Sequence, residues 1–189
     1  MNKLEFKEWP KIYRFNRDIL VTEKIDGTNG CIIIAEDGKG FAVQSRSRII
    51  TPLEDNHGFA NWAYDHREEL LKLGKGYHFG EYWGSGIQRG YGMPQGVKNF
   101  SLFNVKRWQG NPDLPACCKT VPLLYEGPMN QNKIETCLAA LRDYGSQAVP
   151  FMNPEGIVVY HIAANTAFKI TLVNDEKRKS DVKKPETTK

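Results

Sequence analysis

Lys24 is the residue with the clearest chemical potential in this chain, and it lies in the stretch LVTEKIDGTNGCIII, residues 20–34. Apolar runs on both sides predict two strands, with a bend at Asp26-Gly27 between them. One interpretation is an ordinary hairpin that leaves the lysine in solvent. The other is that the lysine points into a pocket and attacks a substrate. A lysine amine is a nucleophile only when neutral, and burial or a nearby positive charge favours that form.

Five further short motifs follow Lys24-Ile25-Asp26-Gly27 in an order typical of covalent nucleotidyltransferases. That superfamily contains the ATP- and NAD-dependent polynucleotide ligases and the mRNA capping enzymes. The motifs are Ser45-Arg46, Phe79-Gly80-Glu81, Leu102–Val105, Pro154–Tyr160 and Phe168–Ile170. The chain therefore resembles this superfamily between residues 23 and 171. Because Thr28-Asn29 continues the lysine motif, it looks most similar to the ATP-dependent RNA ligases of the phage and editing type.

The resemblance implies a covalent reaction at Lys24. The lysine would attack the α-phosphate of ATP, expel pyrophosphate and form a lysyl-AMP. Lys169 and Arg46 would stabilise the negative charge that spreads over the phosphoryl oxygens. AMP would then pass to a 5′-phosphate, and a 3′-hydroxyl would displace it to seal the strand.

The resemblance also implies a set of nucleotide contacts. Glu23 would belong to the nucleotide site beside the lysine, Glu81 would accept hydrogen bonds from the ribose, and Phe103 would stack on the adenine. Glu155 would hold Mg²⁺ or Mn²⁺, directly or through water. Simpler readings remain for three of them: Glu81 as an exposed strand-end acid, Phe103 as a core ring and Glu155 as a turn acid.

The predicted partner is nucleic acid with 5′-phosphate and 3′-hydroxyl ends, RNA in preference to DNA. Arg48 is a further candidate contact, although the spacing of its motif favours Arg46 as the family arginine. The Gly-rich stretch 83–96 resembles a loop of some of these ligases, and Arg89 and Tyr91 within it are candidates for contacting the strand. Such loops can cradle phosphates or be merely flexible.

Two departures from the family pattern keep other functions open. Thr171 stands where the family often has a second lysine, and Asn104 replaces an aspartate. A binding module that keeps the ligase fold without turnover is therefore one alternative. The others are a small nick-sealing DNA ligase and, further away, a capping guanylyltransferase. No OB-fold is expected after the last motif, so an accessory protein for end recognition is one possible partner.

Composition restricts the class of protein. The formal net charge of +4 suits a nucleic-acid partner. No apolar run is long enough to cross a membrane, and the N-terminus lacks a secretory core, so we expect an intracellular, cytoplasmic protein without membrane contact. Its compact core would suit a viral or bacterial enzyme. The four cysteines form no CxxC or Cys/His pattern, which favours free thiols over a zinc site.

The predicted elements are strands and a few helices without regular alternation. We therefore expect an α+β nucleotidyltransferase domain of the ATP-grasp-like ligase type over residues 1–173, with antiparallel sheets and flanking helices. Residues 1–17 should be irregular or partly helical, and residues 174–189 a charged, disordered tail. Strands are predicted at 18–25, 30–36, 41–48, 76–84, 100–108, 155–161 and 166–173, and helices at 55–73 and 132–146.

Overall fold

Two β-sheets form the framework of the computed structural model, which describes residues 4–176. The smaller sheet has the strand order β10-β9-β1-β8, and the larger has the order β4-β3-β2-β5-β6-β7. Only β6 and β7 pair in parallel. The strands are β1 (Asp18–Lys24), β2 (Thr28–Ile34), β3 (Phe41–Ser45), β4 (Ile49–Ile50), β5 (Gly76–Gly84), β6 (Lys98–Leu102), β7 (Cys118–Thr120), β8 (Leu123–Pro128), β9 (Gly156–His161) and β10 (Thr166–Thr171).

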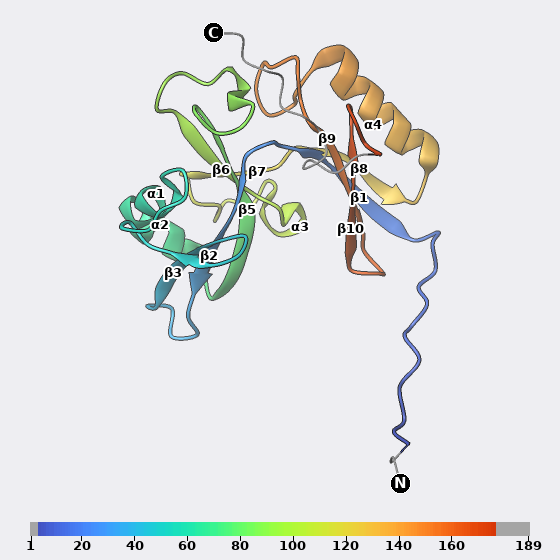
Figure 1. Cartoon of the computed structure of the whole chain (residues 1–189), viewed down its shortest axis with the longest axis horizontal. Coiled ribbons are helices and arrows are strands. Elements are labelled where there is room, and N and C mark those ends of the chain that lie inside the picture. The colour runs from blue at the N-terminus through green and yellow to red at the C-terminus, as the bar shows by residue number, and fades with distance from the viewer. Residues whose placement is uncertain (1–3, 177–189) are drawn as a thin grey trace.

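Helices α1 and α2 cover the outer face of the larger sheet, α4 covers that of the smaller sheet, and α3 lies between the sheets, which confirms the predicted α+β class (Figure 1). The longest, α4, lies on the smaller sheet, where Ile134 and Leu141 pack with Ile19 and Ile157. The helices are α1 (Phe59–Asp65), α2 (Arg67–Leu70), α3 (Val105–Trp108) and α4 (Gln131–Tyr144), with 3₁₀ turns η1 (Leu71–Leu73) and η2 (Gly90–Gly92).

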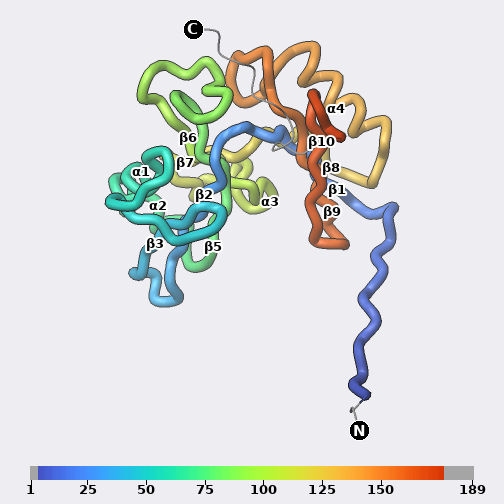
Figure 2. The backbone as a smooth tube through the Cα atoms, in the orientation of Figure 1, coloured from blue at the N-terminus to red at the C-terminus, as the bar shows by residue number. Residues whose placement is uncertain are grey.

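The chain passes from one sheet to the other directly after Lys24 (Figure 2). β1 pairs with β8 and β9, whereas β2 pairs with β3 and β5. The bend at Asp26-Gly27 is therefore a crossing between sheets and not the turn of a hairpin. Since β1 belongs to the smaller sheet and β2, which follows the crossing, belongs to the larger one, Lys24 lies where the two sheets meet.

Strand register places Lys24 beside Gly156 of β9, which in turn pairs with Thr171 of β10. Two residues along each strand, Thr22, Val158 and Lys169 form another such row. Alternate residues of a strand face the same side of a sheet, so the two lysines are presented to the same face. The opposite face of β1 carries Ile19 and Val21, which pack under α4.

Several predicted elements have other bounds in the structure. The strand expected at 100–108 ends at Leu102, and residues 105–108 form α3. Asn104 caps that helix, because its side-chain oxygen accepts a hydrogen bond from the backbone NH of Arg107. The helix expected at 55–73 begins only at Phe59, since the Asp55 carboxylate accepts hydrogen bonds from the backbone NH groups of Ala60 and Asn61.

Three short strands were not predicted, and all lie at sheet edges. They are β4, β7 and β8. β8 ends in Gly127-Pro128, residues that usually mark loops. The strand predicted at 41–48 ends at Ser45, because the chain turns at 46–48 before β4. The last three residues of that segment therefore form a turn that carries Arg46 and Arg48.

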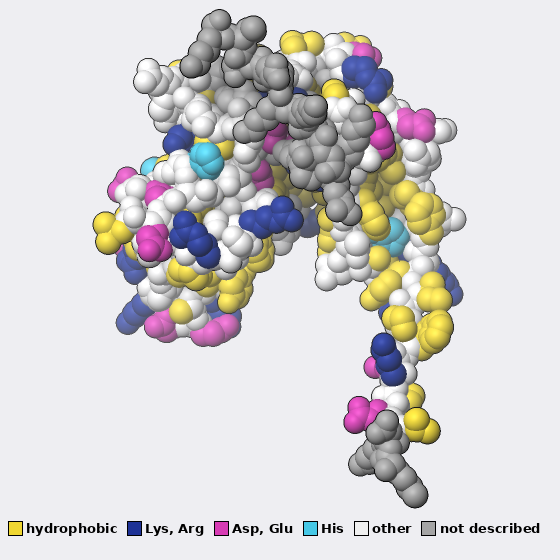
Figure 3. Space-filling view, viewed as in Figure 1, with side chains coloured by type: hydrophobic (Ala, Val, Ile, Leu, Met, Phe, Trp, Pro, Cys, Tyr) yellow, Lys and Arg dark blue, Asp and Glu magenta, His cyan; other side chains and the backbone are white. Residues whose placement is uncertain are grey.

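The two chain ends differ in what the structure shows. Residues 4–17 contain no helix, and their large side chains are exposed, including Leu4, Phe6 and Trp9 (Figure 3). The disorder expected for the tail falls largely on residues 177–189, which lie outside the described residues. Of the rest, Asp175 accepts a hydrogen bond from the NH of Thr171 at 2.7 Å. None of the helices in residues 4–176 has the length and apolar character needed to span a membrane.

The close approach of β9 and β10 at Gly156 generates a stability prediction. This glycine has a φ of 153°, and a Cβ there would lie 2.8 Å from Cα of Thr171. We expect Gly156→Ala to lower the free energy of unfolding by about 3 kcal/mol or more, from backbone strain and overpacking together. Gly38→Ala is the control, because Gly38 has a φ of 70° and open space around it.

Gly38→Ala should lower the free energy of unfolding by only about 1 kcal/mol, because the sole penalty there is the strain of a left-handed backbone. Urea unfolding of both variants measures the difference. Equal losses for the two variants would show that contact between the strands at Gly156 is not tight.

Candidate active site

A cavity of about 1080 Å³ lies between the two sheets, and Lys24 lines it. The smaller sheet contributes residues of β1, β9 and β10, and the larger sheet contributes β5 and the segment after β6. Figure 3 shows the hollow between the two halves of the molecule, with basic side chains at its rim. A cleft of this size can hold a nucleotide.

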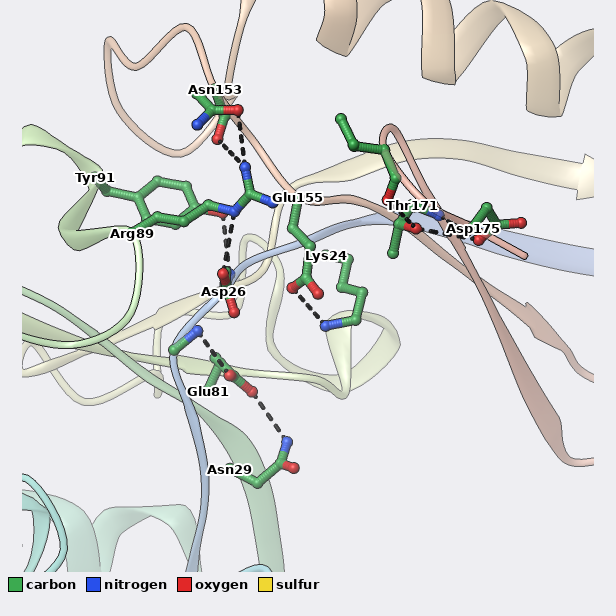
Figure 4. A network of polar contacts seen from close by, with 12 residues as sticks. Lys24, Asp26, Asn29, Glu81, Arg89, Tyr91, Asn153, Glu155, Thr171 and Asp175 are labelled. Carbon is green, nitrogen blue, oxygen red and sulfur yellow. Dashed lines mark hydrogen bonds and ion pairs between the residues drawn. The ribbon is translucent and has the colours of Figure 1, made fainter. Parts of the chain in front are cut away.

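Lys24 and Glu155 form an ion pair within this cleft, with Nζ 2.6 Å from Oε2 (Figure 4). The glutamate side chain is 2% exposed, whereas the lysine side chain is 22% exposed. Glu155 directly precedes β9, and its backbone oxygen accepts a hydrogen bond from the NH of Leu172. The carboxylate therefore comes from a fixed strand end and holds the lysine amine inside the cleft.

Glu81 lies on the opposite wall, near the end of β5. Its Oε1 accepts a hydrogen bond from the NH of Gly27 at 3.0 Å, and its Oε2 accepts one from Nδ2 of Asn29, also at 3.0 Å. Burial raises the pKa of this carboxyl to about 7; the Gly27 hydrogen bond and the charge of Lys24 act in the opposite direction. The acid thus fixes the chain just after the crossing between the sheets.

Arg89 links the Gly-rich loop to both sides of the lysine. Its Nε donates to Asp26 Oδ2 at 3.0 Å, and its Nη1 donates to the backbone and side-chain oxygens of Asn153 at 3.0 and 2.8 Å (Figure 4). Asp26 is two residues after Lys24, and Asn153 is two residues before Glu155. The guanidinium therefore holds together the two segments that carry the ion pair.

Tyr91 does not occupy the position expected for a nucleic-acid contact. The ring is 1% exposed and packs against Trp83 and Phe151, and its hydroxyl accepts a hydrogen bond from the NH of Asp26 at 3.0 Å. This burial contradicts the expectation that Tyr91 contacts a nucleic-acid strand. Its observed contacts are structural, since they anchor the Gly-rich loop to the backbone after Lys24.

Glu23 is predicted to belong to the nucleotide site, but alternation along β1 directs its side chain to the face opposite that of Lys24. Its side chain is 1% exposed, and Oε2 accepts a hydrogen bond from the NH of Gln147 at 2.8 Å. Burial raises its pKa, against hydrogen bonds from Ser146, Gln147 and Ala148. Its carboxylate therefore supports the wall behind Lys24, although Glu23 is among the residues that border the cavity.

The remaining predicted residues divide into two groups. Lys169, Arg46 and Phe103 line the cavity with Lys24, and the ring of Phe103 is 42% exposed. Within residues 4–176, neither Lys169 nor Arg46 forms an ion pair. Arg48 lies outside the cavity lining and pairs instead with Glu54 at 3.6 Å.

Three residues that position the site were not predicted from the sequence to belong to it: Asp26, Asn29 and Asn153. Asp26 and Asn29 stand inside the lysine motif itself, so adjacency to Lys24 was an available signal. Asn153 had no such signal, because its contact with Arg89 joins positions 64 residues apart. Thr171, in the row of Lys24, donates to the backbone oxygen of Val173 at 3.0 Å and supplies no charge.

Two mainly antiparallel sheets around a cleft, with a lysine at their crossing, define a nucleotidyltransferase-type ligase fold. The family described as RNA ligase matches residues 17–171, so the chain belongs to the RNA ligase family. Comparison with curated proteins found no match.

Solved structures show the same fold. A mutant of Naegleria gruberi RNA ligase with ATP and Mn matches with a TM-score of 0.64 and 21% identity, over 87% of this chain and 53% of that chain. An apo mutant of the same ligase matches with a TM-score of 0.61 and 20% identity, over 82% and 49% of the two chains. The chain thus spans about half the length of these ligases.

The raised pKa of Glu81 predicts a pH-dependent contribution to stability. Between its ordinary value of 4.5 and about 7, the folded protein binds a proton at this carboxyl that the unfolded chain has released. The free energy of unfolding should therefore fall as the pH rises through this window, and level off above it. In Glu81→Gln this contribution is absent.

Denaturant unfolding of the wild type and Glu81→Gln from pH 4.5 to pH 8 tests this, because contributions of other groups cancel in the difference. Parallel stability curves would show that Glu81 titrates in the folded protein as it does in the unfolded chain.

The Arg89 contacts predict a second effect on stability. Arg89→Ala removes the guanidinium from Asp26, whose side chain is 10% exposed, and we expect a loss of about 2 kcal/mol or more. Lys75→Ala is the matched control, since Lys75 and Glu36 form an ion pair with exposed fractions of 65% and 84%. That control should lose less than about 1 kcal/mol. Chemical denaturation compares the two, and similar losses would argue against a structural role for Arg89.

Proposed function

We propose that this protein is an ATP-dependent RNA ligase that joins 5′-phosphate and 3′-hydroxyl ends through a lysyl-AMP at Lys24. The observation that carries the proposal is the position of Lys24 in the cleft, with its amine held by a nearly buried carboxylate. Membership of the RNA ligase family supports RNA as the substrate. The Naegleria gruberi structures with ATP and Mn support the choice of nucleotide.

The first step is attack of the Lys24 amine on the α-phosphate of ATP. A bond forms between Nζ and phosphorus, the bond to the bridging oxygen breaks, and pyrophosphate leaves. Nζ must lose a proton, and Glu155 Oε2 lies 2.6 Å away to accept it. Lys169 and Arg46 line the same cavity, and their charges would stabilise the phosphoryl oxygens during this step.

The cleft also offers a place for the adenine. Phe103 follows β6 of the larger sheet and Val158 belongs to β9 of the smaller sheet, and both line the cavity. A purine between an aromatic ring and a branched aliphatic side chain would be held by apolar contact on both faces. Glu81 stays a predicted ribose contact, and its two hydrogen bonds to residues 27 and 29 set its orientation.

Glu155 is the carboxylate predicted to hold Mg²⁺ or Mn²⁺. Residues 4–176 contain no group of three or more His, Cys, Asp or Glu side chains suited to a metal ion. One carboxylate still fits Mg²⁺, which is commonly held by one or two carboxylates, substrate phosphates and water. When bound, the ion would neutralise the triphosphate and favour departure of pyrophosphate.

The second and third steps use the same cations. AMP passes from Lys24 to the 5′-phosphate of the strand, which frees the lysine amine and forms a 5′–5′ pyrophosphate linkage. The 3′-hydroxyl then attacks the 5′-phosphate, forming the phosphodiester bond and releasing AMP. Negative charge develops on phosphoryl oxygens each time, so one cleft lined by Lys24, Lys169 and Arg46 can serve the whole cycle.

The direct test is incubation with α-labelled ATP and Mg²⁺, followed by denaturing electrophoresis. We expect label to stay with the wild type and to be absent from Lys24→Ala and Lys24→Arg. The arginine variant keeps a positive charge but has no amine that is neutral at working pH. Thermal unfolding of the three proteins shows whether loss of label reflects loss of fold.

Substrate choice and the alternatives follow from the same assay. Sealing of an RNA nick in preference to a DNA nick distinguishes an RNA ligase from a small DNA ligase, and labelling by GTP alone would indicate a capping enzyme. No label with ATP, GTP or NAD, in Mg²⁺ or Mn²⁺, would overturn the enzyme proposal. A nucleic-acid-binding module would then be the remaining function.

A further inference from the structure

Two large aromatic rings lie open to solvent on the cleft side of β5. Tyr77 is 64% exposed and Phe79 is 51% exposed, and both line the cavity. Their ring centroids are 6.2 Å apart, with an angle of 13° between the ring planes. Two nearly parallel rings thus present a continuous apolar surface to water.

The alternation of β5 accounts for this placement. Tyr77, Phe79 and Glu81 occupy every second position and share one face, whereas His78 and Tyr82 are buried on the other. At about 3.3 Å per residue, Tyr77 lies roughly 13 Å along the strand from Glu81. The aromatic pair therefore extends the wall of the cleft away from the crossing that carries Lys24.

A second, smaller hollow of about 210 Å³ adjoins the cleft at this pair. Phe79, Phe103 and Arg46 line both spaces, and Gln44 and Ser45 line only the smaller one. Arg46 is exposed and forms no ion pair within residues 4–176. An exposed cation beside exposed rings is the combination that binds a single-stranded nucleic acid, with the charge on a phosphate and the rings on the bases.

We propose that Tyr77 and Phe79 form a stacking platform for unpaired bases of the RNA strand next to the end being joined. This inference rests on the proposed RNA ligase function, and it names the part of the substrate that this wall of the cleft binds. At the inner end of the platform, Arg46 contacts the 5′-phosphate of the strand when AMP is transferred to it, in keeping with its role in the proposed cycle. Phe103 stays with the adenine, so the platform lies beyond the nucleotide along β5.

The burial of other aromatic residues supports a binding role for this pair. On the opposite face of the same sheet, Tyr82 and Phe100 each pack against Phe59 of α1 at a centroid distance of 5.0 Å, and all three are at most 2% exposed. The sheet therefore buries its aromatic residues where it needs them for its core. Stacking of a base on an exposed ring contributes about 1–3 kcal/mol, which offsets part of the cost of ordering a single strand.

The test is binding of a fluorescent single-stranded RNA of roughly twelve nucleotides with a 5′-hydroxyl, which cannot accept AMP. We expect Tyr77→Ala with Phe79→Ala to weaken binding about tenfold or more. Tyr77→Phe with Phe79→Tyr keeps both rings and should bind like the wild type. Tyr144→Ala on α4 is the control, because Tyr144 is also exposed, at 77%, but lies outside the cleft lining.

Replacing adenines of the probe with 2-aminopurine gives a second readout, since stacking on a ring quenches its fluorescence. Unchanged affinity and quenching in the double alanine variant would overturn the platform, as would an equal loss in Tyr144→Ala or no RNA binding by the wild type. The ring-keeping variant guards against misfolding, because it alters the same two positions. In the double alanine variant we also expect AMP transfer to 5′-phosphate RNA to be reduced by a factor about ten times larger than the factor for lysyl-AMP formation.

The two proposals can fail separately. Lysyl-AMP without any effect of the rings on RNA binding would leave the ligase proposal standing and remove the platform. Ring-dependent RNA binding without lysyl-AMP would remove the ligase chemistry and leave the platform as a binding site for single-stranded RNA.

Discussion

The ion pair between Lys24 and Glu155 depends on how one strand is held. β1 lies inside the smaller sheet, paired on both sides, and its register with β9 places Lys24 beside Gly156. Glu155, one residue before that glycine, therefore cannot be far from the amine. Immediately afterwards the chain enters the larger sheet. The same few residues thus join the two sheets and carry the candidate nucleophile, so any shift in β1 would displace both walls of the cleft.

Buried charge explains why so many contacts surround this crossing. Asp26, Glu81 and Glu155 are each less than 9% exposed, and a carboxylate in such surroundings is costly unless a cation or NH groups satisfy it. Arg89, the NH of Gly27 and Lys24 supply those partners. The satisfied network holds the cleft in a defined geometry before a ligand enters, so less reorganisation is left for the reaction itself.

The lining of the cleft combines two characters that suit two kinds of ligand. Lys24, Lys169 and Arg46 supply positive charge, which favours phosphates, and the exposed rings of Tyr77 and Phe79 favour bases. Large exposed apolar surface is uncommon in proteins without a partner for it. A nucleotide and a nucleic-acid strand both combine charge with flat rings, which accounts for a cleft that has both characters.

The sequence by itself determined the class of protein and most residues of the cleft. Lys24, Glu155 and Lys169 stand in short local motifs, and the period-two pattern of apolar residues indicates the main strands, because alternation follows directly from strand geometry. Only the tertiary structure decided that Tyr91 is buried, that Glu23 faces away, and that Arg89 binds Asp26. That contact joins positions 63 residues apart, and no local pattern encodes which distant side chains a fold brings together.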